Sequence, residues 1–77
     1  MSKSNYNKAL KKFGQHLREL RDKKNLSLRD LSYACDIDNS KISKIEKGMI
    51  NITFGTIMQL AEALEVSPSE LLQFETT

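Results

Sequence analysis

The residues with the most useful chemistry lie between positions 39 and 47, where polar and cationic side chains surround two isoleucines. Ile42 and Ile45 are three residues apart, so a helix here turns both inward and leaves the other positions exposed. Asparagine can pair with an adenine edge, lysine with guanine acceptors or phosphate, and serine with either group. The candidates of this kind are Asn39, Ser40, Lys41, Ser43, Lys44 and Lys47. Such a helix is suited to a DNA major groove, although lysines also occur on any solvated helix face.

A recurring spacing marks where the helices start. Four times a hydrophobic residue is followed directly by Ser, Asp or Thr, and a second hydrophobic residue comes four positions later. The polar side chain can accept a hydrogen bond from an unpaired N–H of the first helical turn, and the two hydrophobic residues then pack as a staple. The four predicted caps are Ser27, Asp38, Thr53 and Ser67.

An earlier helix is predicted by periodicity, because five apolar residues recur at spacings of four and three on one helical stripe. They are Tyr6, Leu10, Phe13, Leu17 and Leu20. No alternating β-branched run predicts a strand, and Gly14 and Gly55 weaken the helices around them only slightly. The predicted helices span about residues 5–24, 28–35, 39–47, 54–64 and 68–74. Residues 1–77 therefore form one all-α domain, in which the second and third helices are tied closely enough for a helix-turn-helix.

Length and composition agree with a single small domain. A chain of 77 residues has room for one core, and it buries only roughly 60% of its unfolded surface. No apolar run approaches a membrane span or a signal peptide, and Cys35 alone cannot form an intrachain disulfide. We therefore expect a cytoplasmic protein without membrane contact.

Charge is distributed unevenly, although the net charge is only +2. Basic residues outnumber acidic ones by eight to two in residues 1–24, the counts are four and four in 25–48, and 49–77 carry no basic and four acidic residues. This polarity favours a protein with one end facing phosphate and an acidic end kept away from it. The alternative is a solvated basic helix and an acidic surface that only aids solubility.

Glu46 occupies the inward edge of the third predicted helix, next to Ile45. An acid there is either repelled by DNA phosphate or paired inside the protein. Arg21 on the inward edge of the first helix is the best partner, with Arg18 second. A bidentate pair between Arg21 and Glu46 would make both residues structural.

A longer pattern extends from Phe13 to Leu72, about three quarters of the chain. It comprises Leu17, Arg21, Leu31, the run Ile42-Ser43-Lys44-Ile45-Glu46-Lys47-Gly48, Asn51, and the run Ala61-Glu62-Ala63-Leu64-Glu65-Val66. In these residues the chain resembles the phage-repressor-like helix-turn-helix domains, the XRE or Cro/C1-type family. The resemblance implies a compact five-helix lambda-repressor-like fold with an internal Arg21–Glu46 pair.

The resemblance also implies a division of DNA contacts. Asn39, Ser40 and Lys44 would face base edges, with Lys41 and Ser43 near bases or phosphate. The helix starts at Ser27 and Thr53 would present backbone N–H groups to phosphate. Arg29, Lys47 and Asn51 would lie near the same phosphates.

Three positions depart from the family pattern. Leu28 stands where many members have a glutamine that braces the recognition helix and touches phosphate, so that contact is expected to be absent. Asp36 replaces the usual turn glycine, which is tolerable because Asp can adopt the left-handed conformation. Ile52 replaces a frequent proline, and we expect its staple to Ile57 to compensate.

Other residues do not suggest catalysis or ligand binding. His16, expected to be exposed, has no partner at metal-ligand spacing, and the serines lack a His/Asp arrangement to activate them. There is no glycine-rich phosphate loop either. We therefore expect no enzymatic activity, no cofactor, no metal and no small-molecule ligand.

Together these features predict a sequence-specific, double-stranded DNA-binding transcriptional regulator, a repressor or a controller-type protein. One helix reads few base pairs and useful discrimination needs about 4–10 kcal/mol, so we expect a homodimer on a palindromic operator. Its interface is expected at Met58, Leu72 and Phe74; in the alternative, Phe74 folds back onto the first helix and the domain is monomeric. The protein would be bacterial or phage-encoded and nucleoid-associated when bound. Other possible functions are an antitoxin that also binds a toxin, and a protein-interaction module without specific DNA binding.

Overall fold

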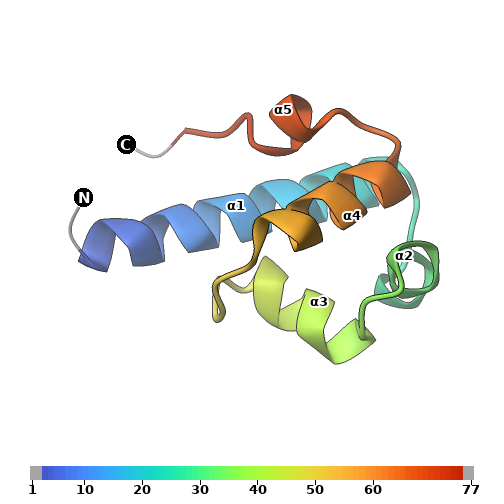
Figure 1. The fold of residues 1–77 in the computed structure, drawn as a ribbon, viewed down its shortest axis with the longest axis horizontal. Coiled ribbons are helices and arrows are strands. Elements are labelled where there is room, and N and C mark those ends of the chain that lie inside the picture. Colours follow the sequence, from blue (N-terminus) through green and yellow to red (C-terminus); the bar gives the residue numbers. More distant parts are fainter. Residues whose placement is uncertain (1–2, 76–77) are drawn as a thin grey trace.

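The chain folds into α-helices joined by short turns, as the sequence predicts. The computed structural model describes residues 3–75, with side chains from Tyr6 to Glu75. Within this range the helices are α1 (Lys3–Lys23), α2 (Leu28–Cys35), α3 (Asn39–Glu46), α4 (Phe54–Leu64) and α5 (Pro68–Leu71). The long α1 crosses the molecule, α2 and α3 lie on one side of it, and α5 lies on the other side next to α4 (Figure 1). The prediction of an all-α, five-helix fold is confirmed for the described residues.

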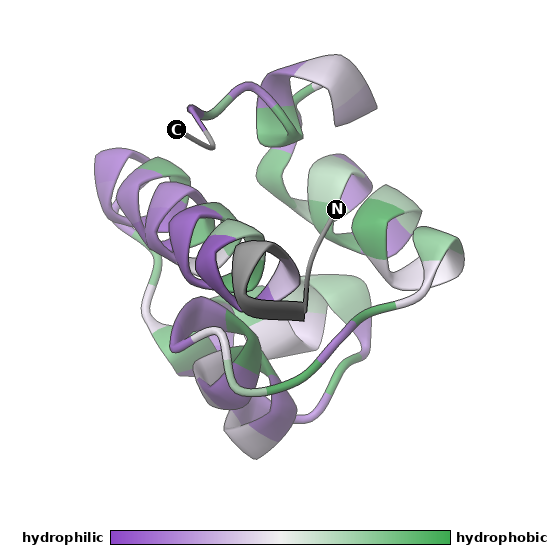
Figure 2. Cartoon of the chain, turned by 90° about the vertical axis from the view of Figure 1, so that its left-hand side faces the viewer, coloured by the Kyte–Doolittle hydropathy of each residue, from purple (hydrophilic) through white to green (hydrophobic). Residues whose placement is uncertain are grey.

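One hydrophobic core joins all the helices. Its fully buried side chains are Leu17, Leu31, Ile42, Ile45, Leu60, Leu64 and Leu71. Every helix supplies at least one of them, which explains how a helix as short as α5 is held in place. Seen along α1, hydrophilic residues cover its outer side and hydrophobic residues face the other helices (Figure 2).

The four predicted caps account for the helix starts. Ser27 accepts from Asp30 N while the Asp30 carboxylate accepts from Ser27 N, both at 3.0 Å, which completes a capping box. Asp38, Thr53 and Ser67 each accept a backbone N–H of the helix that follows. Local sequence therefore decides where α2, α3, α4 and α5 begin.

Left-handed residues end most of the helices. Asn25, Asp36 and Glu65 have φ of 58°, 56° and 58°, and Gly48 has φ of 70°. After α3, Gly48 N donates to the Ile45 carbonyl and Met49 N to the Lys44 carbonyl, the two bonds of a Schellman motif. Asp36 thus adopts the conformation expected of the residue that replaces the turn glycine.

The prediction of a last helix over residues 68–74 is wrong at its carboxyl end, and α5 ends at Leu71. A longer helix would need the Glu70 carbonyl to accept from Phe74 N. That carbonyl instead accepts from His16 Nε2 at 2.8 Å and from Gln73 N at 3.2 Å, while Phe74 N donates to the Leu72 carbonyl. The Phe74 ring packs edge-on against Phe13 with ring centroids 5.9 Å apart. His16, predicted to be exposed, is half-buried and ties α1 to α5.

Gly14 is the point where α1 and α3 touch through their backbones. A Cβ at this position would overlap the carbonyl oxygens of Ile45 and Glu46, at the end of α3. The position therefore requires glycine for close packing, although its sequence signal is only that of a weak helix former.

Arg21 connects three segments of the chain. Its Nε and Nη2 donate to the two carboxylate oxygens of Glu46 at 2.7 and 3.0 Å, and Nη1 donates to the Leu26 carbonyl at 2.8 Å. The Arg21 and Glu46 side chains are only 11% and 7% exposed. The hydrogen bond to Glu46 raises the pKa of the Arg21 guanidinium above its ordinary value. Arg18, the second candidate partner, instead lies 3.9 Å from Asp22 in an exposed pair.

Substitutions at two glycines are expected to change stability in opposite directions. Gly14→Ala must separate α1 from α3 and should cost about 1–3 kcal/mol, as overpacked cores do. Gly55→Ala, on an exposed turn of α4 where the nearest atom to a new Cβ is 3.8 Å away, should stabilise by up to about 1 kcal/mol. Urea denaturation of the two variants measures both effects. Equal stabilisation by the two substitutions would contradict the close approach at Gly14.

Removal of Arg21 is expected to leave Glu46 buried without a partner. Arg21→Ala should then destabilise by about 3 kcal/mol, which corresponds to a fall in Tm of roughly 12 °C or more. Arg18→Ala is the matched control, because its exposed pair contributes at most about 0.5 kcal/mol. Thermal denaturation followed by circular dichroism compares them, and equal melting temperatures would show that the pair contributes no more than a surface contact.

Candidate nucleic-acid interface

Helix α3 presents a polar face to solvent and an apolar face to the core. Ile42 and Ile45 are 0% and 2% exposed, so they fix the rotation of α3 about its own axis. The remaining positions, predicted to read DNA, point away from the core. Asn39, Ser40, Lys41, Lys44 and Lys47 are exposed, and Ser43 is half-buried. Helix α3 therefore carries hydrogen-bond donors and cations on one side, and a helix of this size fits a DNA major groove.

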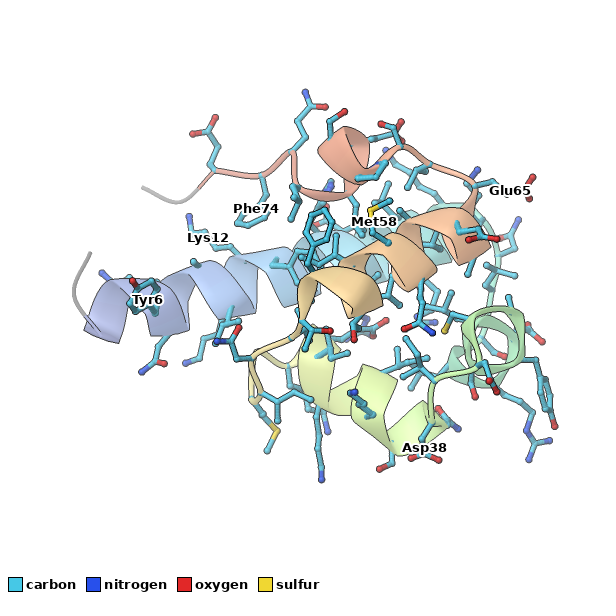
Figure 3. All side chains as sticks on the ribbon, viewed as in Figure 1. Tyr6, Lys12, Asp38, Met58, Glu65 and Phe74 are labelled. Carbon is cyan, nitrogen blue, oxygen red and sulfur yellow. The ribbon has the colours of Figure 1, made fainter. Side chains whose placement is uncertain are left out.

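The amino-terminal end of α3 also carries a carboxylate that the sequence predicts only as a cap. Asp38 Oδ2 accepts from Ser40 N at 3.1 Å, and the side chain is exposed. Figure 3 shows Asp38 at the end of α3 that lies far from α1. A carboxylate there disfavours a phosphate and can accept from a cytosine amino group. Its position immediately before Asn39 and Ser40 is the signal that could have identified it.

The helices before and after α3 in the chain, α2 and α4, each begin with backbone N–H groups that could bind an anion. Ser27 and Thr53 cap α2 and α4, and each hydroxyl accepts one N–H, at 3.0 and 3.2 Å, which leaves other first-turn N–H groups for an anion. Arg29 on α2 is exposed. Asn51 is exposed before α4, and its Oδ1 accepts from Ile52 N at 2.9 Å, so its amide N–H groups point elsewhere.

An acid lies within the first turn of α2. Hydrogen bonding with Ser27, above all from its backbone N–H, lowers the pKa of the Asp30 carboxyl group. Asp30 is therefore a negative charge beside a predicted phosphate contact, and Arg29 next to it supplies the opposite charge.

Leu28 is half-buried and packs against the core. An apolar side chain at this position cannot make a polar contact to α3 or to phosphate. Ile52 and Ile57 are likewise half-buried against the core.

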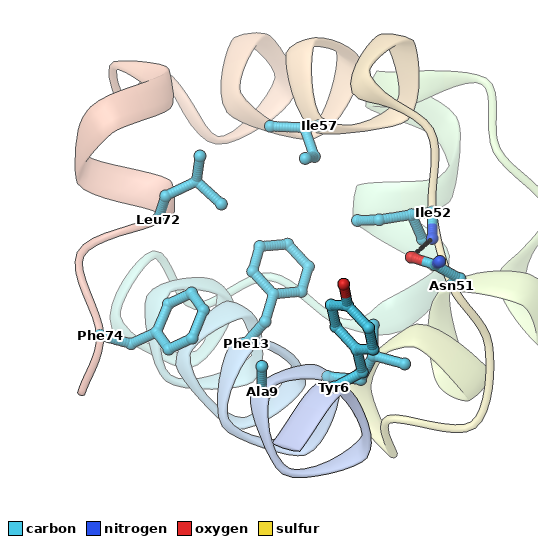
Figure 4. Close-up of a pocket in the computed structure, with 9 residues that line it drawn as sticks. Tyr6, Ala9, Phe13, Asn51, Ile52, Ile57, Leu72 and Phe74 are labelled. Carbon is cyan, nitrogen blue, oxygen red and sulfur yellow. Dashed lines mark hydrogen bonds between the residues drawn. The ribbon is translucent and has the colours of Figure 1, made fainter. Parts of the chain in front are cut away.

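The surface predicted to bind a second copy lies away from α3. Met58 and Leu72 are each 43% exposed. Phe74 is half-buried, with its ring against Phe13, which is the folded-back arrangement of the monomeric alternative. A mainly apolar cavity of about 200 Å³ adjoins it, between α1, the segment before α4, and the C-terminal residues (Figure 4).

The residues that the structure describes give little support for metal binding, nucleophilic catalysis or membrane insertion. No group of three His, Cys, Asp or Glu residues there could hold a metal ion. Cys35 is buried, and burial raises the pKa of its thiol, so it is a poor nucleophile. None of the described helices is both long and apolar enough to span a membrane.

The family model for the helix-turn-helix matches residues 17–71. Control protein C.BamHI of Bacillus amyloliquefaciens is 40% identical over 65 residues, which cover 83% of this chain and 80% of that protein. The crystal structure of the restriction-modification controller protein C.AhdI from Aeromonas hydrophila matches with a TM-score of 0.79 and 44% identity, covering 80% of this chain and 94% of that one. For the controller protein C.Esp1396I the TM-score is 0.76, the identity 30%, and the coverage 83% and 86%.

The matched segment contains the whole of the interface described above, from the Arg21–Glu46 pair through α3 to the start of α4. It confirms the resemblance that the sequence suggested. The chain therefore belongs to the phage-repressor-type helix-turn-helix family and is a DNA-binding transcriptional regulator, homologous to the non-enzymatic controller proteins of restriction–modification systems.

Proposed function

We propose that this protein binds a palindromic operator as a homodimer, with α3 of each copy in the major groove, and controls transcription of restriction–modification genes. The genetic role is supported by the likeness to C.BamHI, C.AhdI and C.Esp1396I, which are described as control or controller proteins. The antitoxin and interaction-module alternatives have no comparable support among these relatives.

The division of α3 into two faces carries the proposal. Ile42 and Ile45 are committed to the core, and Glu46 is held by Arg21, so the acid of this helix is neutralised inside the protein. The exposed face is left with amide, hydroxyl and ammonium groups, the set that recognises base edges and phosphate.

Base reading is assigned to the residues nearest the start and middle of α3. Asn39, Ser40 and Lys44 face the base edges, while Lys41 and Ser43 lie between bases and phosphate. Phosphate contacts come from the flanking elements and fix the register of α3. They are Ser27, Arg29, Lys47, Asn51 and Thr53.

A second copy is needed for specificity. One α3 reads too few base pairs to supply the roughly 4–10 kcal/mol that separate specific from non-specific binding, and a two-fold pair doubles the contacts. Met58 and Leu72 offer exposed apolar side chains on the acidic half of the chain, away from α3. Phe74 packs on Phe13 of α1 and is half-buried, so it offers less apolar surface than these two residues.

Selection from random duplexes at near-physiological salt is expected to enrich a palindrome with half-sites about one helical turn apart, or a multiple of it. On that operator Lys44→Ala should weaken binding by about 1–3 kcal/mol and relax the preference at one base-pair position. Arg29→Ala should instead weaken binding to every sequence alike and reduce the salt dependence.

Affinities of both variants for the operator and its single-base variants, measured by fluorescence anisotropy, separate these effects. A uniform loss for Lys44→Ala as well would contradict its assignment to base reading. Failure to enrich any sequence would favour the interaction-module function instead.

The dimer surface is tested by a charge placed at its centre. Met58→Glu should shift the protein from dimer to monomer in sedimentation equilibrium and lower operator affinity. Met49→Glu is a matched control for the sedimentation measurement, since Met49 is also exposed, at 64%, but lies in the turn after α3. Wild-type protein that binds the operator as a single copy would contradict the homodimer. A dimer that persists unchanged in Met58→Glu would instead contradict the assignment of the interface to Met58.

A further inference from the structure

The first half of α1 lies outside the region that the helix-turn-helix family model matches, which begins at residue 17. This segment is helical from Lys3 onward and carries exposed lysines, including Lys11. Because no DNA contact is assigned to it above, its position relative to α3 decides whether it has a role in binding.

Lys11 lies directly against the end of α3. A Cβ added at Gly48 would lie 2.6 Å from Lys11 Cα and 2.7 Å from Lys11 N, so the two backbones are in contact. Gly14, three residues later on α1, meets the carbonyls of Ile45 and Glu46 in the same way. Residues three apart share a helix face, so Lys11 and Gly14 both lie on the α3 side of α1.

The positive charge at this junction is not balanced by a nearby acid. Lys11 and Lys47 are both exposed, and neither takes part in the ion pairs formed among the described residues. Glu46, the acid next to Lys47, is mostly buried and bound to Arg21. Lys47 precedes Gly48 in the chain and Lys11 lies against it, so two cationic side chains begin next to this glycine and favour an anion there.

The position of this junction in the fold indicates which kind of anion would bind there. The chain from Gly48 leads within five residues to Thr53, whose helix start is already assigned to a DNA phosphate. Asn51 and Ile52, just before Thr53, line the same cavity as Ala9 and Leu10 of α1, so the start of α4 lies close to this part of α1. We propose that Lys11 binds a backbone phosphate of the operator, so that α1 extends the DNA contacts beyond the helix-turn-helix; this proposal rests on the proposed function.

Lys12 provides a matched control for Lys11. It is the next residue on α1, so it lies about a quarter turn away, and it belongs to the face that carries His16 toward α5. Lys12 lines a polar depression with Glu19 and Glu75, and Figure 3 shows it on the side of α1 that faces Phe74, away from α3. Replacement of either lysine by glutamine changes the net charge equally.

The salt dependence of binding measures phosphate contacts. Binding constants are measured for labelled operator and for an unrelated duplex over a range of KCl concentrations. The slope of log K against log [KCl] should become shallower by about 0.9 for each phosphate contact removed, hence by about 1.8 for a dimer of Lys11→Gln. Affinity for the two duplexes should fall by the same factor, since phosphate carries no sequence information. Lys12→Gln should keep the wild-type slope, and Lys11→Arg should restore it.

Each outcome bears on one of the two proposals. If wild-type protein prefers the operator and Lys11→Gln has the same slope as Lys12→Gln, the Lys11 contact is wrong while the proposed function stands. If wild-type protein shows neither preference nor a salt-dependent slope, the proposed function itself fails. Thermal denaturation of each variant, with little change in Tm expected because Lys11 is exposed and Lys12 is only half-buried, shows that a lost slope is not due to unfolding.

Discussion

The junction between α1 and the end of α3 is the constraint on which the rest of the structure depends. Gly14 lets the two backbones touch, and the Arg21–Glu46 pair next to it fixes their orientation. Burial of two charges is costly unless their hydrogen bonds are satisfied. Here the third arm of Arg21, through Nη1, binds the Leu26 carbonyl, so one guanidinium holds α1, the turn before α2 and α3 together.

This junction also has an electrostatic consequence for DNA binding. A free glutamate on α3 would oppose the approach of phosphate. Because Glu46 is paired inside the protein, the exposed part of α3 carries cations and neutral polar groups after its Asp38 cap. The same contact that orients the helix therefore removes a charge that would weaken its function.

Much of the fold could be predicted because its signals are local. The caps at Ser27, Asp38, Thr53 and Ser67 act within one helical turn, and the periodic apolar residues define which face of each helix is buried. The end of α5 and the burial of His16 were mispredicted because they depend on a contact between residues 54 positions apart. The need for glycine at position 14 was missed for the same reason, since only the folded chain brings α3 against it.

For the candidate site, too, the sequence predicts the local features but not the contacts between distant segments. The sequence indicates which α3 residues are exposed, because two buried isoleucines set the face. It does not indicate what lies beside that face, and so the carboxylate of Asp38 was predicted only as a cap and Lys11 only as part of a basic helix. For Phe74 the sequence leaves an interface and a fold-back onto the first helix both open, because only the folded chain brings its ring against Phe13.

Leu28 is a position at which this chain departs from the family pattern, and the departure concerns the contacts that hold α3. Where a polar side chain would brace α3 from α2, this chain has a leucine that packs into the core. Polar positioning of α3 is then concentrated at its carboxyl end, in Arg21, Glu46 and the Gly14 contact. The amino-terminal half, which carries Asn39 and Ser40, is positioned by Ile42 and by the Asp38 cap. The long-range polar contacts of α3 are thus concentrated at its carboxyl end, whereas its amino-terminal half is positioned by apolar packing and a local cap.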